Sequence, residues 1–263
     1  MDAFIYDKTF DGLLSCVFAA YAGGVFPERL LPAAGPIPLF IDSTYNITTE
    51  VAKAARVWTG LEKKLTSQVC GMLIHVWLSE REGSDELLFR YIRKAFDRPA
   101  GYATDFTDTE VIRVYKIAGQ VGREMQRLIQ FVRFQKAADG VFFAPVSPDC
   151  NALPLTVDHF TDRFTDQRWL IYDVRRRYGY YYDMRSASEV TIEHDSHLID
   201  GRLSEALLSG DELLFQEMWR EYTISLTIRE RLNPRLQRQQ MPTRFRKYMP
   251  ETATVTAVTD RFY

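Results

Sequence analysis

The first half of the chain carries apolar residues at intervals of three and four positions, the spacing that aligns side chains on one face of a helix. Short apolar runs bounded by turn-forming residues instead predict strands. This half is therefore expected to be mostly helical, with helices over residues 11–21, 51–65, 67–80, 85–96 and 110–132 and strands over residues 3–6 and 39–41.

Polar residues that are typical N-caps precede two of these helices. Thr48 or Thr49 is expected to cap the helix whose inward face begins with Val51. Thr107 and Glu110 have the spacing of a capping box, in which each side chain bonds to the backbone of the other residue. Both signals predict where a helix begins.

Aromatic and β-branched residues dominate the second half and predict strands over residues 141–146, 168–174, 178–183 and 189–192. The second and third of these runs are nearly adjacent, which indicates a hairpin. A short helix is expected at 157–164. A longer helix at 211–230, stopped by Asn233-Pro234, places Phe215, Trp219, Tyr222 and Leu226 on one stripe.

These elements indicate an α+β fold, with a mostly helical N-terminal half and a small, largely antiparallel sheet contributed mainly by residues 140–192. No shift in composition marks a domain boundary, so residues 1–250 are interpreted as a single α+β unit. Two lobes remain the alternative, with residues 1–137 mainly helical and residues 138–250 carrying the strands. Residues 251–263 lack periodicity and are expected to form an irregular tail.

The composition, 46% hydrophobic and 26% charged over 263 residues, is typical of a globular protein and excludes a disordered or collagen-like chain. The N-terminus lacks the basic start and apolar run of a signal peptide. The most apolar stretches are well short of the roughly 20 residues that a membrane span requires. We therefore expect a cytoplasmic protein with no membrane association.

The cysteines Cys16, Cys70 and Cys150 are far apart, which argues against a zinc ribbon, a self-contained iron–sulfur cluster or a disulfide framework. His194 and His197 could form half of a metal site, but no nearby cysteine completes it. No metal or other cofactor is expected. Because the net charge is −2, any contact with nucleic acid must come from a local basic patch.

One candidate pocket combines the turn residues Asp149 and Asn151 with His159 and Arg163, which are four positions apart on the predicted short helix and share a face. An imidazole and a guanidinium beside this turn could hold a phosphate or a carboxylate. The alternative is that Asp149 and Asn151 only build the turn and that His159 is an ordinary surface histidine.

A candidate nucleic-acid site lies in the predicted hairpin, where three arginines precede a run of tyrosines. Strand alternation puts the rings of every second tyrosine on one face, where they could stack on unpaired bases while the arginines hold phosphates. Aromatic rows also fill ordinary sheet cores, and that alternative stays open. The residues are Arg175, Arg176, Arg177, Tyr178, Tyr180 and Tyr182.

A second basic run follows the last predicted helix. Such a run favours nucleic acid through release of counterions from the phosphates, with little sequence preference. A solvated helix end would show the same residues. The candidate phosphate contacts are Arg235, Arg238, Arg244, Arg246 and Lys247.

The order Pro148-Asp149, then Asp173-Val174-Arg175, resembles the acidic pair and basic residue of one class of metal-dependent nucleases. Two carboxylates could hold a magnesium ion against a scissile phosphate. However, Arg175 stands in place of the usual lysine, and a guanidinium does not readily lose a proton, so it could orient water without acting as a base. A nuclease is therefore the second hypothesis.

Motifs spread along nearly the whole chain resemble one family, that of DNA metabolism proteins that accompany a radical S-adenosylmethionine protein of DNA repair or modification. They are Tyr6-Asp7-x-x-Phe10-Asp11-Gly12, Gly140 to Ala144, Pro148-Asp149-x-Asn151, His159-Phe160-x-x-Arg163-Phe164, Trp169 to Asp173, and Glu230-Arg231-Leu232-Asn233-Pro234-Arg235-Leu236-Gln237 with Met241-Pro242. The resemblance implies a role beside that radical enzyme, and in some relatives a uracil-DNA glycosylase-like domain follows.

Three functional hypotheses result. The first is a DNA-repair or DNA-modification accessory protein that binds DNA, a radical S-adenosylmethionine partner enzyme, or both. The second is a metal-dependent enzyme acting on DNA, with a pocket around Asp149 and His159. The third is a module that binds only protein.

Overall fold

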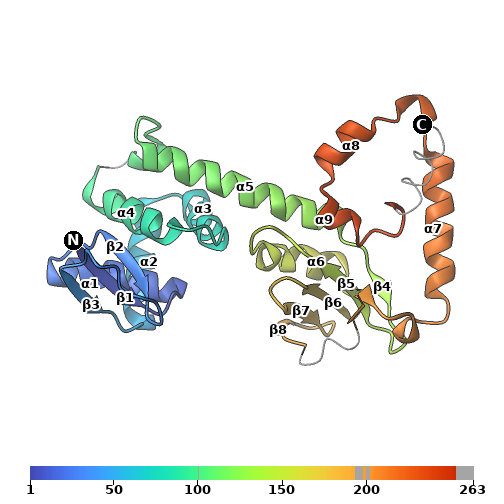
Figure 1. The fold of residues 1–263 in the computed structure, drawn as a ribbon, viewed down its shortest axis with the longest axis horizontal. Coiled ribbons are helices and arrows are strands. Elements are labelled where there is room, and N and C mark those ends of the chain that lie inside the picture. Colours follow the sequence, from blue (N-terminus) through green and yellow to red (C-terminus); the bar gives the residue numbers. More distant parts are fainter. Residues whose placement is uncertain (100, 193–197, 200–201, 253–263) are drawn as a thin grey trace. The chain divides into compact units, whose positions relative to one another are not determined.

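The computed structural model describes residues 1–99, 101–192, 198–199 and 202–252 of the chain (Figure 1). The chain divides into two compact units, Met1–Gly122 and Arg123–Tyr263, and each is described separately below. Helices and strands are both present in quantity, with helices dominating the N-terminal half. The α+β class expected from the sequence is thereby confirmed.

The first unit contains a parallel sheet of three strands in the order β2-β1-β3. Its central strand is largely buried, and helix α1 follows it with Thr9 as the N-cap. The helix ends at Gly23, and the C-cap Gly24 has a left-handed φ of 68°. Glycine adopts this conformation without steric cost. The elements are β1 (Asp2–Tyr6), α1 (Phe10–Gly23), β2 (Arg29–Pro32) and β3 (Ser43–Asn46).

The strand expected at residues 39–41 is absent, and this expectation was wrong. Leu39 and Phe40 lie in a turn and are 96% and 85% exposed. The edge strand β2 forms instead inside the proline-rich connection, where Leu30 and Leu31 are buried. Pro32 ends this strand at the sheet edge, where a proline displaces no ladder hydrogen bond.

Helices complete the core of the first unit. Helix α2 buries Ala54, Val57 and Leu61, so its inward face is turned away from the expected position and Val51 is exposed. Its N-cap is Glu50, because the hydroxyl of Thr49 donates to Asp7 instead. The helices are α2 (Val51–Lys64), α3 (Ser67–Leu78), α4 (Ser84–Asp97), the 3-10 turn η1 (Tyr102–Thr104) and the start of α5 (Thr109–Phe131).

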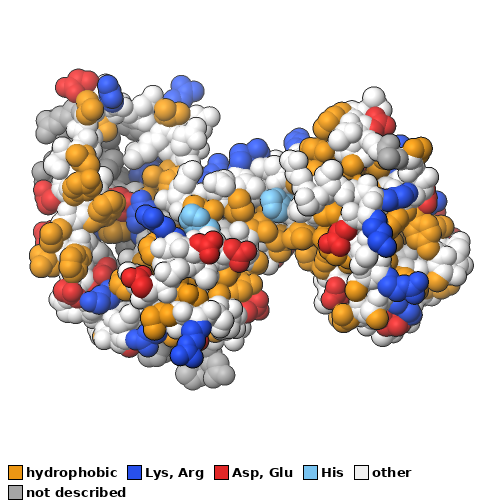
Figure 2. All heavy atoms as spheres, turned by 180° about the vertical axis from the view of Figure 1, so that it is seen from behind, with side chains coloured by type: hydrophobic (Ala, Val, Ile, Leu, Met, Phe, Trp, Pro, Cys, Tyr) orange, Lys and Arg blue, Asp and Glu red, His pale blue; other side chains and the backbone are white. Residues whose placement is uncertain are grey.

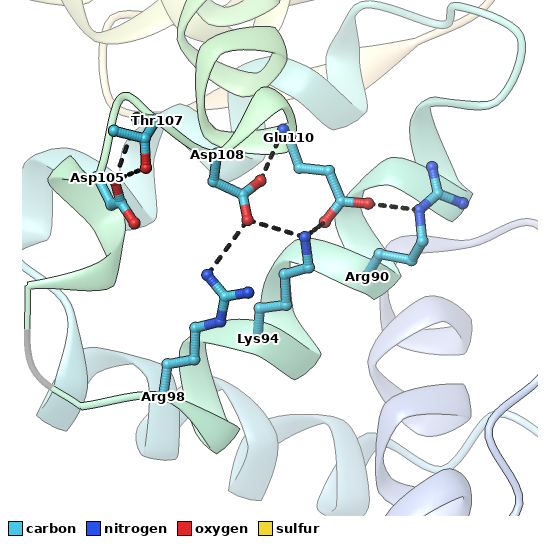
Figure 3. A network of polar contacts seen from close by, with 7 residues as sticks. All are labelled: Arg90, Lys94, Arg98, Asp105, Thr107, Asp108 and Glu110. Atoms are coloured by element: carbon cyan, nitrogen blue, oxygen red, sulfur yellow. Dashed lines mark hydrogen bonds and ion pairs between the residues drawn. The ribbon is translucent and has the colours of Figure 1, made fainter.

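A polar network ties α4 to the beginning of α5 (Figure 3). Lys94 lies 2.9 Å from a carboxylate oxygen of Asp108 and 2.9 Å from one of Glu110, and its hydrogen bond helps to lower the pKa of Asp108. The Glu110 carboxylate therefore faces α4, and the expected capping box with Thr107 does not form. Thr107 donates to Asp105, while Asp108 accepts the amide hydrogen of Glu110 at 2.8 Å.

The second unit is built on a sheet of five strands in the order β4-β5-β6-β7-β8. Within this described sheet β5 and β6 are parallel and the other neighbours are antiparallel, so the expectation of a largely antiparallel sheet with a β6–β7 hairpin is confirmed. The strands are β4 (Gln135–Lys136), β5 (Phe142–Val146), β6 (Trp169–Asp173), β7 (Tyr178–Tyr182) and β8 (Ala187–Val190).

The connection between β5 and β6 runs through a short helix that packs on the sheet. Phe160 of this helix is buried in the same cluster as Trp169 and Ile171 of β6. Leu128, near the end of α5, lies in this cluster too. The connecting elements are the 3-10 turn η2 (Leu153–Thr156) and α6 (Val157–Arg163).

The parallel pairing of β5 with β6 decides where the polar loops lie. Val146 at the end of β5 pairs with Asp173 at the end of β6, and the amide of Val174 donates to the carbonyl of Val146 at 2.9 Å. Parallel strands present their carboxyl ends at one sheet edge, where open sheets commonly bind ligands. The loop after β5 and the turn after β6 are therefore neighbours.

After the sheet, helix α7 ends at Leu226, earlier than expected, and Asn233-Pro234 begins a helix rather than stopping one. The side chain of Asn233 accepts the amide hydrogen of Leu236 at 3.0 Å as the N-cap of α8. The elements are β9 (Leu198–Ile199), β10 (Arg202–Leu203), η4 (Glu205–Leu207), α7 (Glu212–Leu226), η5 (Arg229–Arg231), α8 (Pro234–Gln240) and α9 (Thr243–Arg246). Over the residues described, no helix has both the length and the apolar character needed to cross a membrane.

Candidate functional site

The loop after β5 and the turn after β6 are joined by hydrogen bonds at the carboxyl edge of the sheet. Arg175 donates from Nη1 to the carbonyl oxygen of Asp149 at 3.2 Å, and Arg176 donates from Nη1 to that of Pro148 at 3.1 Å. Tyr178 donates its phenol proton to Oδ1 of Asn151. Two groups of residues that are separate in the sequence thus form one site.

The carboxylate of Asp173 fixes the backbone of the arginine turn. Asp173 is fully buried, and its Oδ1 accepts the amide hydrogens of Arg175 at 2.9 Å and of Arg176 at 3.2 Å. Its Oδ2 receives Nη1 of Arg176 at 2.8 Å. Arg177 adopts a left-handed φ of 61°, and its amide donates to the carbonyl of Asp173 at 2.8 Å. The turn therefore holds one shape.

A buried glutamate from α5 supports the loop after β5. Glu124 is only 3% exposed, and its Oε1 accepts the amide hydrogen of Asp149 at 2.9 Å. Arg244 of α9 donates to both Glu124 oxygens, at 2.9 and 2.6 Å, and Arg127 lies 3.2 Å away. Arg244 also pairs with the exposed carboxylate of Asp149 at 3.0 Å.

The charges of these residues favour binding of an anion. Among the residues of these loops and of the helices that support them, five are arginines and three are carboxylates, so this group of residues is positively charged on a protein whose net charge is −2. A local excess of positive charge on a fixed turn attracts phosphate or carboxylate ligands. The residues are Arg127, Arg175, Arg176, Arg177 and Arg244 against Glu124, Asp149 and Asp173.

Glu124 was missed by sequence reasoning, although the sequence contains a signal for it. The residue lies three positions after Val121 and four before Leu128, on the apolar stripe of α5. A carboxylate on a buried helix face requires a partner, since an unpaired buried charge is costly. The partner, Arg244, lies 120 positions further along the chain.

His159 and Arg163 do not join this site. Both are exposed on α6, where the ring of His159 packs against the edge of Phe160 at 5.3 Å between centroids. Among the described contacts, none links either residue to Asp149 or Asn151. The structure thus brings together Asp149 and Asn151 with the arginine turn, rather than with the α6 pair.

The tyrosines of β7 pack largely toward the sheet core. Tyr182 is 4% exposed and stacks on Trp169 with ring centroids 5.4 Å apart. Tyr178 and Tyr180 are half-buried against the same cluster, and Tyr180 donates to Glu189 at 3.3 Å. Tyr182 therefore offers no open face on which a base could stack.

Some residues of the C-terminal basic run are partly buried in structural contacts, and the others are exposed. Arg244 is held by Glu124, and Arg246 is half-buried. Lys247 is exposed with its ammonium 4.4 Å from the ring centre of Tyr248, and Arg235 and Arg238 are exposed on α8. His194 and His197 lie outside the described residues. Within those described, no cluster of three or more histidine, cysteine or carboxylate side chains could hold a metal ion.

The carboxylates of the nuclease-like pattern both bind arginines. Asp149 is paired with Arg244, and the Asp173 carboxylate is turned into its own loop, where it meets Arg176 and two amide groups. A cation at this place would have to displace these contacts. The geometry consequently gives more support to anion binding than to the two-carboxylate arrangement.

The charge of Glu124 leads to a prediction about pH. Burial raises the pKa of this carboxyl group, but the hydrogen bonds from Arg244 and the Asp149 amide, with the charge of Arg244, outweigh burial and hold the pKa below its ordinary value. A carboxyl group with a depressed folded-state pKa stabilises the fold above its unfolded pKa of about 4.3. This stabilisation is lost as the pH falls through the lower, folded-state pKa.

Urea unfolding of the wild type and of Glu124→Gln between neutral and acid pH would measure this effect. The difference in unfolding free energy should be largest near neutrality and shrink below about pH 4. Glu62→Gln, on the exposed side of α2, is the control and should show a small difference at every pH. A Glu124→Gln difference that does not change with pH would contradict the assignment.

The fold and this edge define an α+β protein with an arginine turn at the carboxyl ends of two parallel strands. The chain belongs to the family DUF4130, a domain of unknown function, whose sequence profile matches residues 82–251. That segment is more than half of the chain and contains every residue of the site described above. No curated protein and no solved structure matches the chain.

Proposed function

We propose that this protein is a DNA-repair or DNA-modification accessory protein that binds DNA through the arginine turn after β6. The observation that carries the proposal is the geometry of that turn. Arg175 and Arg177 are exposed at the carboxyl edge of the sheet, on a backbone that the buried Asp173 holds in place. Arginines with a fixed backbone lose less conformational entropy when they bind phosphates.

The contacts available to DNA are fewer than the sequence indicated. Arg176 and Arg244 are held by buried carboxylates, so their first role in this proposal is structural. Arg175 and Arg177 are the proposed phosphate contacts. Exposed cations further along the chain are further candidates, namely Arg235, Arg238 and Lys247.

The proposed partner is a radical S-adenosylmethionine enzyme. This part of the proposal rests on the motifs that resemble DNA metabolism proteins, several of which lie at the site itself. Asp149 and Asn151 belong to one such motif, and Asp173 ends another. Since the three cysteines of this chain do not form a cluster-binding triad, the partner would supply the radical chemistry.

Fluorescence anisotropy with labelled single-stranded and double-stranded DNA tests the proposal. Changing both Arg175 and Arg177 to alanine should weaken binding about tenfold at low salt. The slope of log affinity against log salt should fall by about 1.8 for duplex DNA, because about 0.9 counterion is released per phosphate contact. Arg176 is left intact, so that the turn keeps its shape.

Arg185→Ala is the matched control. Arg185 is an exposed arginine in the turn between β7 and β8, which lies at the opposite edge of the sheet because β7 runs antiparallel to β6. Its removal should leave affinity and salt slope close to those of the wild type. If the double variant also binds DNA like the wild type, the arginine turn is not the contact surface.

A further inference from the structure

Helix α7 has its polar face turned toward the rest of its unit. Its least exposed residues are Glu212, Gln216, Arg220 and Thr223, which are spaced by three and four positions. The Glu212 carboxylate accepts the amide hydrogen of Lys136 at 2.9 Å. The Arg220 Nε donates to the carbonyl of Pro250 at 3.2 Å. Among the described residues, hydrogen bonds of this polar face therefore help to hold α7 on its own unit.

The apolar stripe of α7 faces outward instead. Figure 2 shows hydrophobic side chains gathered along this helix. A surface helix normally turns its apolar stripe toward the core, so this arrangement leaves an unusually large apolar surface exposed. The exposed fractions are 56% for Phe215, 57% for Met218, 42% for Trp219, 54% for Tyr222 and 61% for Leu226.

The spacing of this stripe is that of a helix–helix seam. Phe215, Trp219, Tyr222 and Leu226 follow one another at intervals of four, three and four positions, the alternation found in coiled coils. Trp219 and Tyr222 already stack with ring centroids 5.5 Å apart. A second helix with the same spacing could insert its side chains between those of the first.

The residues beside the seam are compatible with an identical partner. Gln216 and Thr223 flank one side and Met218 and Ser225 the other, so two copies would bring no like charges together across the seam. The remaining face of α7 includes the acidic Glu217 and Glu221, whereas helices that bind lipid surfaces usually carry lysine and arginine there.

The exposed area is sufficient for a dimer. An aromatic side chain contributes about 150–250 Å² when fully buried, so about half of that from each of Phe215, Trp219 and Tyr222 gives roughly 300 Å² per chain. With the exposed Met218 and Leu226 added, two copies would bury on the order of 1,000 Å², the lower limit for a specific interface. Exposed Leu214 and, beyond the helix, Ile228 and Leu232 would add to this area.

We propose that α7 is a dimerisation helix and that its apolar stripe packs against the same stripe of a second copy of this chain. The interface is isologous, because both copies present the same surface. The proposal is independent of DNA binding, since the stripe shares no residue with the arginine turn.

Sedimentation equilibrium of the full chain from about 1 to about 100 µM tests the proposal in the range where a weak dimer dissociates. The wild type should reach twice the chain mass of 30.5 kDa. Trp219→Glu should raise the dimer dissociation constant at least about 100-fold, as expected for a central aromatic residue of an interface. Leu226→Gln, a milder change on the same stripe, should act in the same direction.

Glu217→Gln, on the remaining exposed face of the same helix, is the matched control and should leave the dimer intact. Circular dichroism would show that each variant keeps its fold, which is expected because the replaced side chains are exposed. A wild type that stays monomeric would overturn the proposal, as would a dimer that survives both stripe substitutions. A monomer that binds another protein or lipid vesicles through the stripe would assign α7 to that partner instead.

Discussion

Replacing Asp173 with alanine is expected to lower the free energy of unfolding by about 3 to 5 kcal/mol, the cost of removing one partner of a buried ion pair. The carboxylate is fully buried, and its loss removes the ion pair between Asp173 and Arg176. The amide groups of Arg175 and Arg176 lose their acceptor at the same time. Urea unfolding at neutral pH, followed by circular dichroism, measures the change.

The chain contains its own control for this prediction. Asp183 accepts the amide hydrogens of Arg185 and Ser186, both at 2.8 Å, in a turn of similar design at the opposite sheet edge, but it is exposed. Asp183→Ala should therefore cost much less than Asp173→Ala, because solvent can replace the hydrogen bonds of an exposed carboxylate. Asp173→Asn should fall between the two, since it keeps an acceptor oxygen and loses the charge. Equal losses at Asp173 and Asp183 would show that burial of the ion pair is unimportant.

Local patterns were sufficient to predict much of the fold. The apolar stripe of α5 was read correctly at Val111, Val114 and Leu128, all of which are buried, because the period of a long amphipathic helix is repeated many times. The hairpin of β6 and β7 was also predicted, since aromatic and β-branched runs on both sides of a short turn favour antiparallel pairing.

These local patterns could not predict which distant strands pair. The parallel pairing of β5 with β6 carries no local signal, although it is what brings Asp149 beside Arg175. Strand β2 was missed for a different reason. The prolines of the surrounding connection indicate a loop, whereas Leu30 and Leu31 are buried by neighbours from elsewhere in the chain. Such contacts depend on tertiary packing rather than on propensity.

The candidate site, like the fold, could be predicted only in part from local patterns. The arginine turn and the Asp149 loop were both singled out from their residue types, but their roles depended on partners that only the fold supplies. Arg244 belonged to a basic run typical of a phosphate-binding surface, yet it faces Glu124. A charged residue in a run of like charges can therefore be structural when a distant buried residue of opposite sign requires it.

Removal of Arg244 is the second prediction with a large effect. Arg244→Ala is expected to cost about 3 to 5 kcal/mol of unfolding free energy, because Glu124 is 3% exposed and, among the described residues, would keep only Arg127 as a charged partner. The loop after β5 should loosen too, since Glu124 accepts the Asp149 amide hydrogen. Urea unfolding gives the first quantity, and hydrogen exchange of the Asp149 amide gives the second.

A double variant with apolar replacements separates the ion pair from the packing of α9. Glu124→Leu together with Arg244→Met should recover most of the stability lost in Arg244→Ala, because apolar side chains of similar size can replace a buried ion pair at little cost. Arg238→Ala, an exposed arginine of α8, should change stability by less than about 0.5 kcal/mol. If Arg244→Ala costs no more than Arg238→Ala, Arg244 is a surface cation after all, and it returns to the set of candidate phosphate contacts.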